Sequence, residues 1–231
     1  MMGAAISRAL EQIWDPAFRK VLAWSLLWTV LLFVALAAGV SELIDYAPQA
    51  QSRWINIAAD IGAWLLFLGA AWFLFPAFAT AIMGLFLDDA AEAVERRYYP
   101  TDDPGVPLGL GTAFWEAVKL GLVILGVNIA ALPLYLLALL VPPVGPLAVY
   151  YLINGYLLGR EYFELVAMRH LRPAQVRMLR RSRRGSMILY GAPIAFVFSI
   201  PVVNLVAPLF GTAYMVHIFK SISRNSRPHE P

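Results

Sequence analysis

The chain has 231 residues, of which 60% are hydrophobic and only 14% are charged, and its net charge is +3. Soluble domains usually carry about 25% charged residues, so this composition excludes an ordinary soluble protein and indicates a membrane protein. The sequence contains no cysteine, which excludes disulfides and thiolate metal sites.

The first element is predicted as an amphipathic helix over residues 1–17 that lies in the membrane interface. Ile6, Leu10 and Ile13 fall on one side at helical spacing, and Arg8 and Glu11 fall on the other. The first long apolar run starts only after this segment, so we expect no cleavable signal.

The first membrane-spanning helix is predicted over residues 18–44. Residues 21–40 are twenty uncharged positions, which suffice to cross a hydrocarbon core of roughly 30 Å at about 1.5 Å per residue. A polar stretch follows, and a long second spanning helix is predicted over residues 54–98. We expect it to kink near Pro76 and to continue into the cytoplasm as one helix, an extension that a Glu92–Arg96 pair would support.

Two helical hairpins are predicted in the second half of the chain, over residues 111–170 and 185–222. Each apolar run is interrupted by a proline-rich tip, "VPPVGP" in the first and "IPVVNLVAP" in the second. The arm from Ser186 to Ile200 would be only about 22 Å long, so the second hairpin is predicted to penetrate the bilayer partway. For the first hairpin, the alternative that both arms cross the whole bilayer stays open.

Basic residues indicate the orientation of the chain. Seven arginines lie between Arg169 and Arg184, and residues 171–184 are predicted as a basic cytoplasmic segment, with 223–231 as a tail. Two crossings and two hairpins place every large basic cluster on one side, which the positive-inside rule makes cytoplasmic. The arginines from Arg177 to Arg184 are expected to face water and lipid headgroups, and no nucleic acid is expected as a partner. The fold class is therefore an all-α integral membrane protein with a single membrane domain.

The segment "DPAFRK" places two cations at the start of the first spanning helix. Asp15 suits the N-cap, and the free N–H groups of Ala17 and Phe18 lie beside Arg19 and Lys20. A helix start with flanking cations can bind an anion. It can equally be an interfacial anchor whose N–H groups Asp15 already satisfies, and both interpretations stay open at this point.

Polar residues at membrane depth are candidates for a pathway or gate. These candidates are Asn128, Asn154, Arg160, Glu161, Glu164 and Asn204. Among them, Arg160 and Glu164 are spaced i, i+4 on a helix and can pair. Intramembrane ionisable groups are functional candidates by default, although the charged ones here could also mark a helix end emerging into water, and asparagines commonly join helices. We find no HExxH, GxSxG or Walker motif, so we expect no enzyme activity, no cofactor and no metal site.

Three stretches carry a resemblance to a known family: "FPAFATAIMGLFLDDAAEAVERRYY", "LVPPVGPLAVYYLINGYLLGREYFELVAMRHL" and "IPVVNLVAPLFGTAYMV". In their order and spacing the chain resembles the CysZ family of bacterial sulfate permeases. The resemblance implies a multi-pass protein of the bacterial inner membrane with two long spanning helices and two pairs of shorter helices. It also implies sulfate uptake for cysteine biosynthesis without ATP hydrolysis, contact with membrane lipids, and a homo-oligomer, with a hexamer as one assembly it allows.

The resemblance also implies a sulfate site. The family's Gly-Leu-Arg-Arg type motif maps onto Ala17, Phe18, Arg19 and Lys20, where Ala replaces Gly and Lys replaces the second Arg. Lysine lacks the bidentate fork of arginine. Two other functions stay open: a permease for a related oxyanion, and a structural membrane protein that binds or curves the bilayer without transporting sulfate.

Overall fold

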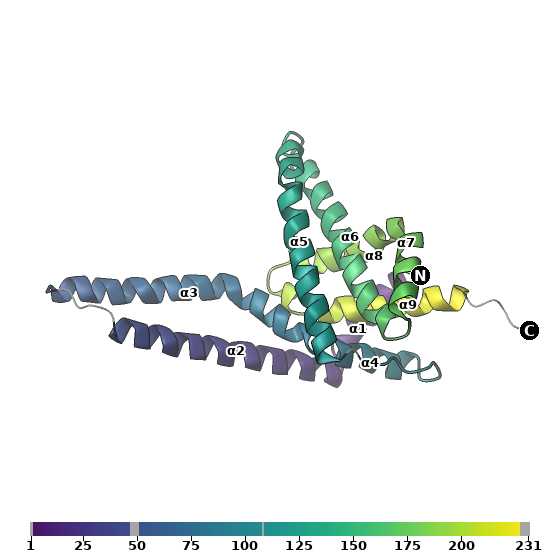
Figure 1. The fold of residues 1–231 in the computed structure, drawn as a ribbon, viewed down its shortest axis with the longest axis horizontal. Coiled ribbons are helices and arrows are strands. Elements are labelled where there is room, and N and C mark those ends of the chain that lie inside the picture. Colours follow the sequence, from purple (N-terminus) through teal and green to yellow (C-terminus); the bar gives the residue numbers. More distant parts are fainter. Residues whose placement is uncertain (1, 47–50, 108, 227–231) are drawn as a thin grey trace, which may run out of the picture. The chain divides into compact units, whose positions relative to one another are not determined.

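The computed structural model describes residues 2–46, 51–107 and 109–226, without the side chains of residues 110, 112–114, 116–121, 123–125, 128, 225 and 226. Within these ranges the regular structure is helical (Figure 1). The elements are α1 (Met2–Gln12), α2 (Pro16–Asp45), α3 (Arg53–Gly84), α4 (Leu87–Tyr98), α5 (Leu110–Ala138), α6 (Val144–Met168), α7 (Pro173–Ser182), α8 (Arg184–Ser199), the 3-10 helix η1 (Val203–Leu205) and α9 (Ala207–Ser226).

The chain divides into two compact units, a smaller one of residues 20–84 and a larger one of residues 1–19 and 85–231. The smaller unit holds most of α2 and all of α3, which lie side by side (Figure 1). The ring of Phe33 in α2 contacts the rings of Phe75 and Phe78 in α3, with centroids 5.6 and 5.8 Å away. These two helices have 30 and 32 residues, or about 45 and 48 Å.

Both helices are long and apolar enough to cross a membrane by length and composition. Their most apolar windows are only 17% and 6% buried in the structure. The core helix of a soluble protein would be mostly buried, so these exposed apolar surfaces fit lipid better than water.

Helix α9 is the centre of the larger unit. Every residue from Ala207 to Lys220 is buried, because α1, α4, α6 and α8 all pack against it. Its largest buried side chains include Phe210 and Tyr214, whose rings stack with centroids 5.8 Å apart. The buried apolar face of α4, formed by Leu87, Ala90 and Val94, belongs to this core.

Helices α6 and α8 cross at unusually close range through three glycines. A methyl group on Gly191 of α8 would overlap backbone atoms of Gly155 and Gly159 in α6, and one on Gly159 would overlap the backbone of Met187. Gly155 and Gly159 form a GxxxG pair, the spacing that lets helix backbones approach in membranes. The sequence contains this signal in "GYLLG", although the sequence interpretation did not use it.

The structure corrects the predicted continuous helix over 54–98. The segment forms two helices, α3 ending at Gly84 and α4 beginning at Leu87. Asp88 and Asp89 occupy the first turn of α4, where carboxylates stabilise a helix N-terminus. Because the helix is interrupted here, α4 can turn its apolar face to α9 and pack against it.

Helix α1 packs on α9, and its Ala5, Ala9 and Gln12 are buried in this contact. Its place in the membrane interface stays a prediction. Leu10 and Trp14 remain 48% and 80% exposed, so part of the apolar face stays free. The predicted hairpins correspond to α5 with α6 and α8 with α9, and the predicted basic segment contains α7. Part of the predicted tail, residues 227–231, lies outside the described residues.

We predict that Gly191→Ala destabilises the larger unit by about 1–3 kcal/mol, because the added methyl forces α6 and α8 apart. The matched control is Gly185→Ala in the same helix, where nothing lies within 4 Å of the new methyl. There the exchange should be neutral or mildly stabilising, since alanine favours helix. Thermal unfolding of both variants in detergent measures the difference, and equal melting temperatures would contradict the close crossing.

Candidate functional site

The start of α2 is organised by Asp15. A tight turn follows α1, in which the N–H of Asp15 donates to the carbonyl of Gln12 at 2.9 Å. Pro16 then opens the helix, and the N–H of Ala17 donates to Oδ1 of Asp15 at 2.9 Å. The N–H of Arg19 donates to the Asp15 carbonyl at 3.0 Å. The predicted N-cap is therefore confirmed.

The capping carboxylate is also an ion-pair partner. Nη1 of Arg97, at the end of α4, lies 2.7 Å from Oδ2 of Asp15. The Arg97 guanidinium lies over the ring of Tyr98, 5.4 Å from its centroid, and Arg8 of α1 lies 5.8 Å from the same centroid. Asp15 thus already binds the N–H of Ala17 and the guanidinium of Arg97. An incoming anion would have to displace it from both.

The four residues of the predicted anion site differ in exposure. Ala17 is half-buried, and Phe18 is fully buried in the larger unit. Arg19 and Lys20 are exposed, and neither forms an ion pair within the described part of the chain. Two unpaired cations at a helix start attract anions, although Asp15 reduces the local positive charge.

The charged pathway candidates of α6 form a short chain of ion pairs. Nε of Arg160 lies 3.3 Å from Oε1 of Glu164, as the i, i+4 spacing predicted. The same oxygen lies 2.7 Å from Nη1 of Arg180 in α7. Arg180 therefore binds Glu164, and the prediction that all arginines from 177 to 184 are solvated is wrong for this one. Glu161 is half-buried on the same helix.

The asparagine candidates lie apart from this chain. Nδ2 of Asn154 donates to the carbonyl of Tyr150 one turn earlier, at 3.1 Å. Asn204 lies in η1, and its buried Oδ1 has no partner among the described atoms. Val202, the residue just before η1, has φ = 68°, a strained conformation for a β-branched residue. The side chain of Asn128 lies outside the described residues.

A buried ion cluster, formed by Asp88, Glu95, Arg169 and His170, was not anticipated from the sequence. The Arg169 side chain has no solvent exposure, and its guanidinium lies 2.8 Å from Oδ1 of Asp88 and 3.3 Å from Oε2 of Glu95. Nε2 of His170 lies 2.7 Å from Oε1 of Glu95. These contacts join the end of α6 to α4.

The loop after α4 closes over the same cluster. The N–H of Gly105 donates to Oε2 of Glu95 at 3.3 Å, and the N–H of Val106 donates to the carbonyl of Arg169 at 2.9 Å. A side chain at position 105 would meet Nε of Arg169 at 2.8 Å, so glycine is needed for this approach. In the sequence Arg169 belonged to a basic cluster, and nothing in its local pattern distinguished a buried arginine from exposed ones.

The family model for "Sulfate transporter CysZ/Etoposide-induced protein 2.4" matches residues 5–208. The chain belongs to this family. Among curated proteins, none matches the chain closely enough to count as a relative.

The family match includes both the start of α2 and the cluster around Arg169. It also includes every residue that the sequence nominated for a site, from Ala17 to Asn204. The match ends at Pro208, near the beginning of α9. The part of the chain that matches the family therefore contains the candidate anion site. Arg19 and Lys20 as ligands of that site stay predictions.

The acid of the buried cluster has a shifted pKa. Burial alone would raise the pKa of Glu95, but the hydrogen bond with His170 and the charge of Arg169 outweigh it and lower the pKa below its ordinary value of 4.5. The ionised form of Glu95 is therefore the one that the fold selects.

We predict that the fold loses stability at low pH because Glu95 becomes protonated. Because its folded pKa is lowered, the carboxylate stabilises the fold above pH 4.5, and this contribution is lost as the pH falls through the lowered pKa. Glu95→Gln should therefore melt well below the wild type at pH 7, and the gap should narrow as the pH falls below 4.5. Melting curves at several pH values test this, and a gap that stays constant would exclude the assignment.

Proposed function

We propose that this protein is a sulfate permease or channel that mediates sulfate uptake across the bacterial inner membrane for cysteine biosynthesis without ATP hydrolysis. The observation that carries the proposal is the family match over residues 5–208. The two long apolar helices α2 and α3 support a membrane location. In this proposal the protein is multi-pass, faces the cytoplasm with its basic clusters and works as a homo-oligomer without covalent chemistry.

Sulfate would be recognised at the start of α2. The backbone N–H groups of Ala17 and Phe18 would donate to its oxygens, and Arg19 and Lys20 would neutralise its charge. Lys20 supplies a point charge where a second arginine would give a fork of two parallel hydrogen bonds. This difference favours weaker and less geometrically selective oxyanion binding.

Asp15 would act as a resident competitor for the incoming anion. Its carboxylate accepts from Ala17 and pairs with Arg97, so sulfate and Asp15 claim the same donor. Release of Asp15 would free both the N–H and the Arg97 guanidinium. Binding at this site therefore requires exchange of one carboxylate for one dianion.

Further along the pathway, the proposed lining is polar without a large charge surplus. The charges of Arg160 and Arg180 are partly balanced by Glu164, which both contact. Such a group can pass an anion without trapping it, because no isolated cation holds it tightly. Asn128, Asn154 and Asn204 would supply neutral donors between the hairpins.

Direct flux measurement tests the function. Entry of a dianion against 100 mV, negative inside, costs about 4.6 kcal/mol, so the membrane potential must be controlled. We expect proteoliposomes containing the full chain to take up labelled sulfate down its gradient at zero potential, and an inside-negative potential to slow this uptake. Vesicles without protein are the control. Sulfate impermeability would exclude the permease, and preferred uptake of another oxyanion would reassign its substrate.

Two opposite variants test the binding site. The double variant Arg19→Ala, Lys20→Ala should weaken sulfate binding by about tenfold or more, because charge-assisted contacts are lost. Asp15→Asn keeps an acceptor for Ala17 but removes the competing charge, so it should tighten binding by about threefold to fivefold. The matched controls are Arg53→Ala and Asp89→Asn, both exposed. Equilibrium binding of labelled sulfate gives the affinities, and unchanged values in both tests would remove the site.

A further inference from the structure

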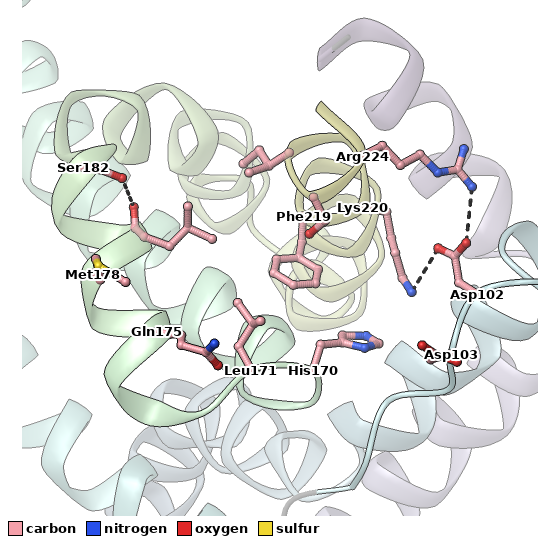
Figure 2. Close-up of a pocket in the computed structure, with 13 residues that line it drawn as sticks. Asp102, Asp103, His170, Leu171, Gln175, Met178, Ser182, Phe219, Lys220 and Arg224 are labelled. Carbon is pink, nitrogen blue, oxygen red and sulfur yellow. Dashed lines mark hydrogen bonds and ion pairs between the residues drawn. The ribbon is translucent and has the colours of Figure 1, made fainter. Parts of the chain in front are cut away.

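A cavity of about 570 Å³ opens between α7, α9 and the loop that follows α4. Figure 2 shows its charged residues gathered at one end, around Lys220 and Arg224, with Met178 and Gln175 of α7 at the other. Both cations lie beyond residue 208, outside the part of the chain that the family model matches. The volume lies within the range of about 300–1,000 Å³ that small-molecule sites have.

The charged end of the cavity carries both signs. Nζ of Lys220 lies 3.2 Å from one oxygen of Asp102, and Nη2 of Arg224 lies 3.6 Å from the other. One carboxylate thus serves two cations, which leaves one net positive charge. The exposed Asp103 lines the same cavity and forms no ion pair within the described part of the chain, which leaves one unpaired negative charge.

The cations are held in place by an aromatic ring. Nζ of Lys220 lies 5.6 Å and the guanidinium of Arg224 lies 5.2 Å from the centroid of Tyr99. The Tyr99 hydroxyl lies 2.9 Å from Nδ1 of His217. Contacts with Tyr99 thus position both cations, and the same cavity contains the carboxylate of Asp103, so each charge of a zwitterion would find a partner there.

The rest of the lining is mixed. It has five apolar side chains, Leu171, Met178, Leu179, Phe219 and Ile222, and four polar ones, His170, Gln175, Ser182 and Ser223. Met178 is 68% exposed, so its apolar side chain is accessible to an acyl chain. A soluble zwitterion would leave this wall uncovered, whereas a lipid would place its glycerol and first acyl carbons against it.

We propose that this cavity binds phosphatidylethanolamine, a lipid that carries both a phosphate and a primary ammonium. The phosphate pairs with Arg224 and Lys220, and the ammonium donates to Asp103. Phosphatidylglycerol lacks the ammonium, and phosphatidylcholine has no N–H to donate. The inference does not depend on sulfate transport.

The test uses the full chain in detergent and the short-chain lipid dihexanoyl phosphatidylethanolamine, with binding measured by thermophoresis. We expect the wild type to bind it at least about fivefold more tightly than dihexanoyl phosphatidylglycerol. Asp103→Asn should abolish that preference, and Asp89→Asn, an exposed carboxylate outside the cavity, should keep it. Arg224→Gln should weaken binding of both lipids, because both contain phosphate, and thermal unfolding without lipid verifies that each variant is folded.

Four results would overturn the proposal. An unchanged preference in Asp103→Asn would remove the ammonium site, and phosphatidylglycerol binding as tightly as phosphatidylethanolamine would identify an anionic-lipid surface instead. Phosphoethanolamine without acyl chains, binding as tightly as the lipid, would identify a soluble zwitterion as the ligand. Wild-type binding that is equally weak for all three probes would leave the cavity without a lipid function.

Discussion

The buried guanidinium of Arg169 must be neutralised, because an unpaired charge without solvent contact costs several kcal/mol. The chain meets this requirement by bringing α4 to the end of α6, where Asp88 and Glu95 accept from Arg169. Once α4 is held there, Arg97 at its far end reaches Asp15 at the start of α2. The geometry of the candidate anion site therefore depends on a cluster that touches no anion.

The residues that stabilise the fold are therefore different from those proposed to bind the anion. Glu95 and Arg169 are buried and find partners within the cluster: Arg169 contacts Asp88 and Glu95, and Glu95 also contacts His170. Arg19 and Lys20 are instead open to solvent, where a ligand can reach them. Buried pairs fix a conformation and exposed cations remain available, so the two kinds of basic residue have different tasks although both belong to basic clusters in the sequence.

The close crossing of α6 and α8 has a related consequence. Gly155, Gly159 and Gly191 let the two helix backbones come into contact, which larger side chains at these positions would prevent. It leaves α9 enclosed by four helices while its C-terminal part still contributes Lys220 and Arg224 to an open cavity. The larger unit thus combines a rigid core with a charged, accessible edge.

Composition and apolar run length by themselves determined the helical class, the two long helices and the proline-rich interruptions, because a bilayer demands a fixed number of apolar residues. Local spacing likewise predicted the Asp15 cap and the Arg160–Glu164 pair, since both involve residues within one turn. The tertiary structure decided the rest. The break before α4, the docking of α1 on α9 and the burial of Arg169 depend on contacts between segments distant in sequence. Such contacts leave no periodic signal, because burial of a charge is set by the partner that the fold brings to it and not by its neighbours along the chain.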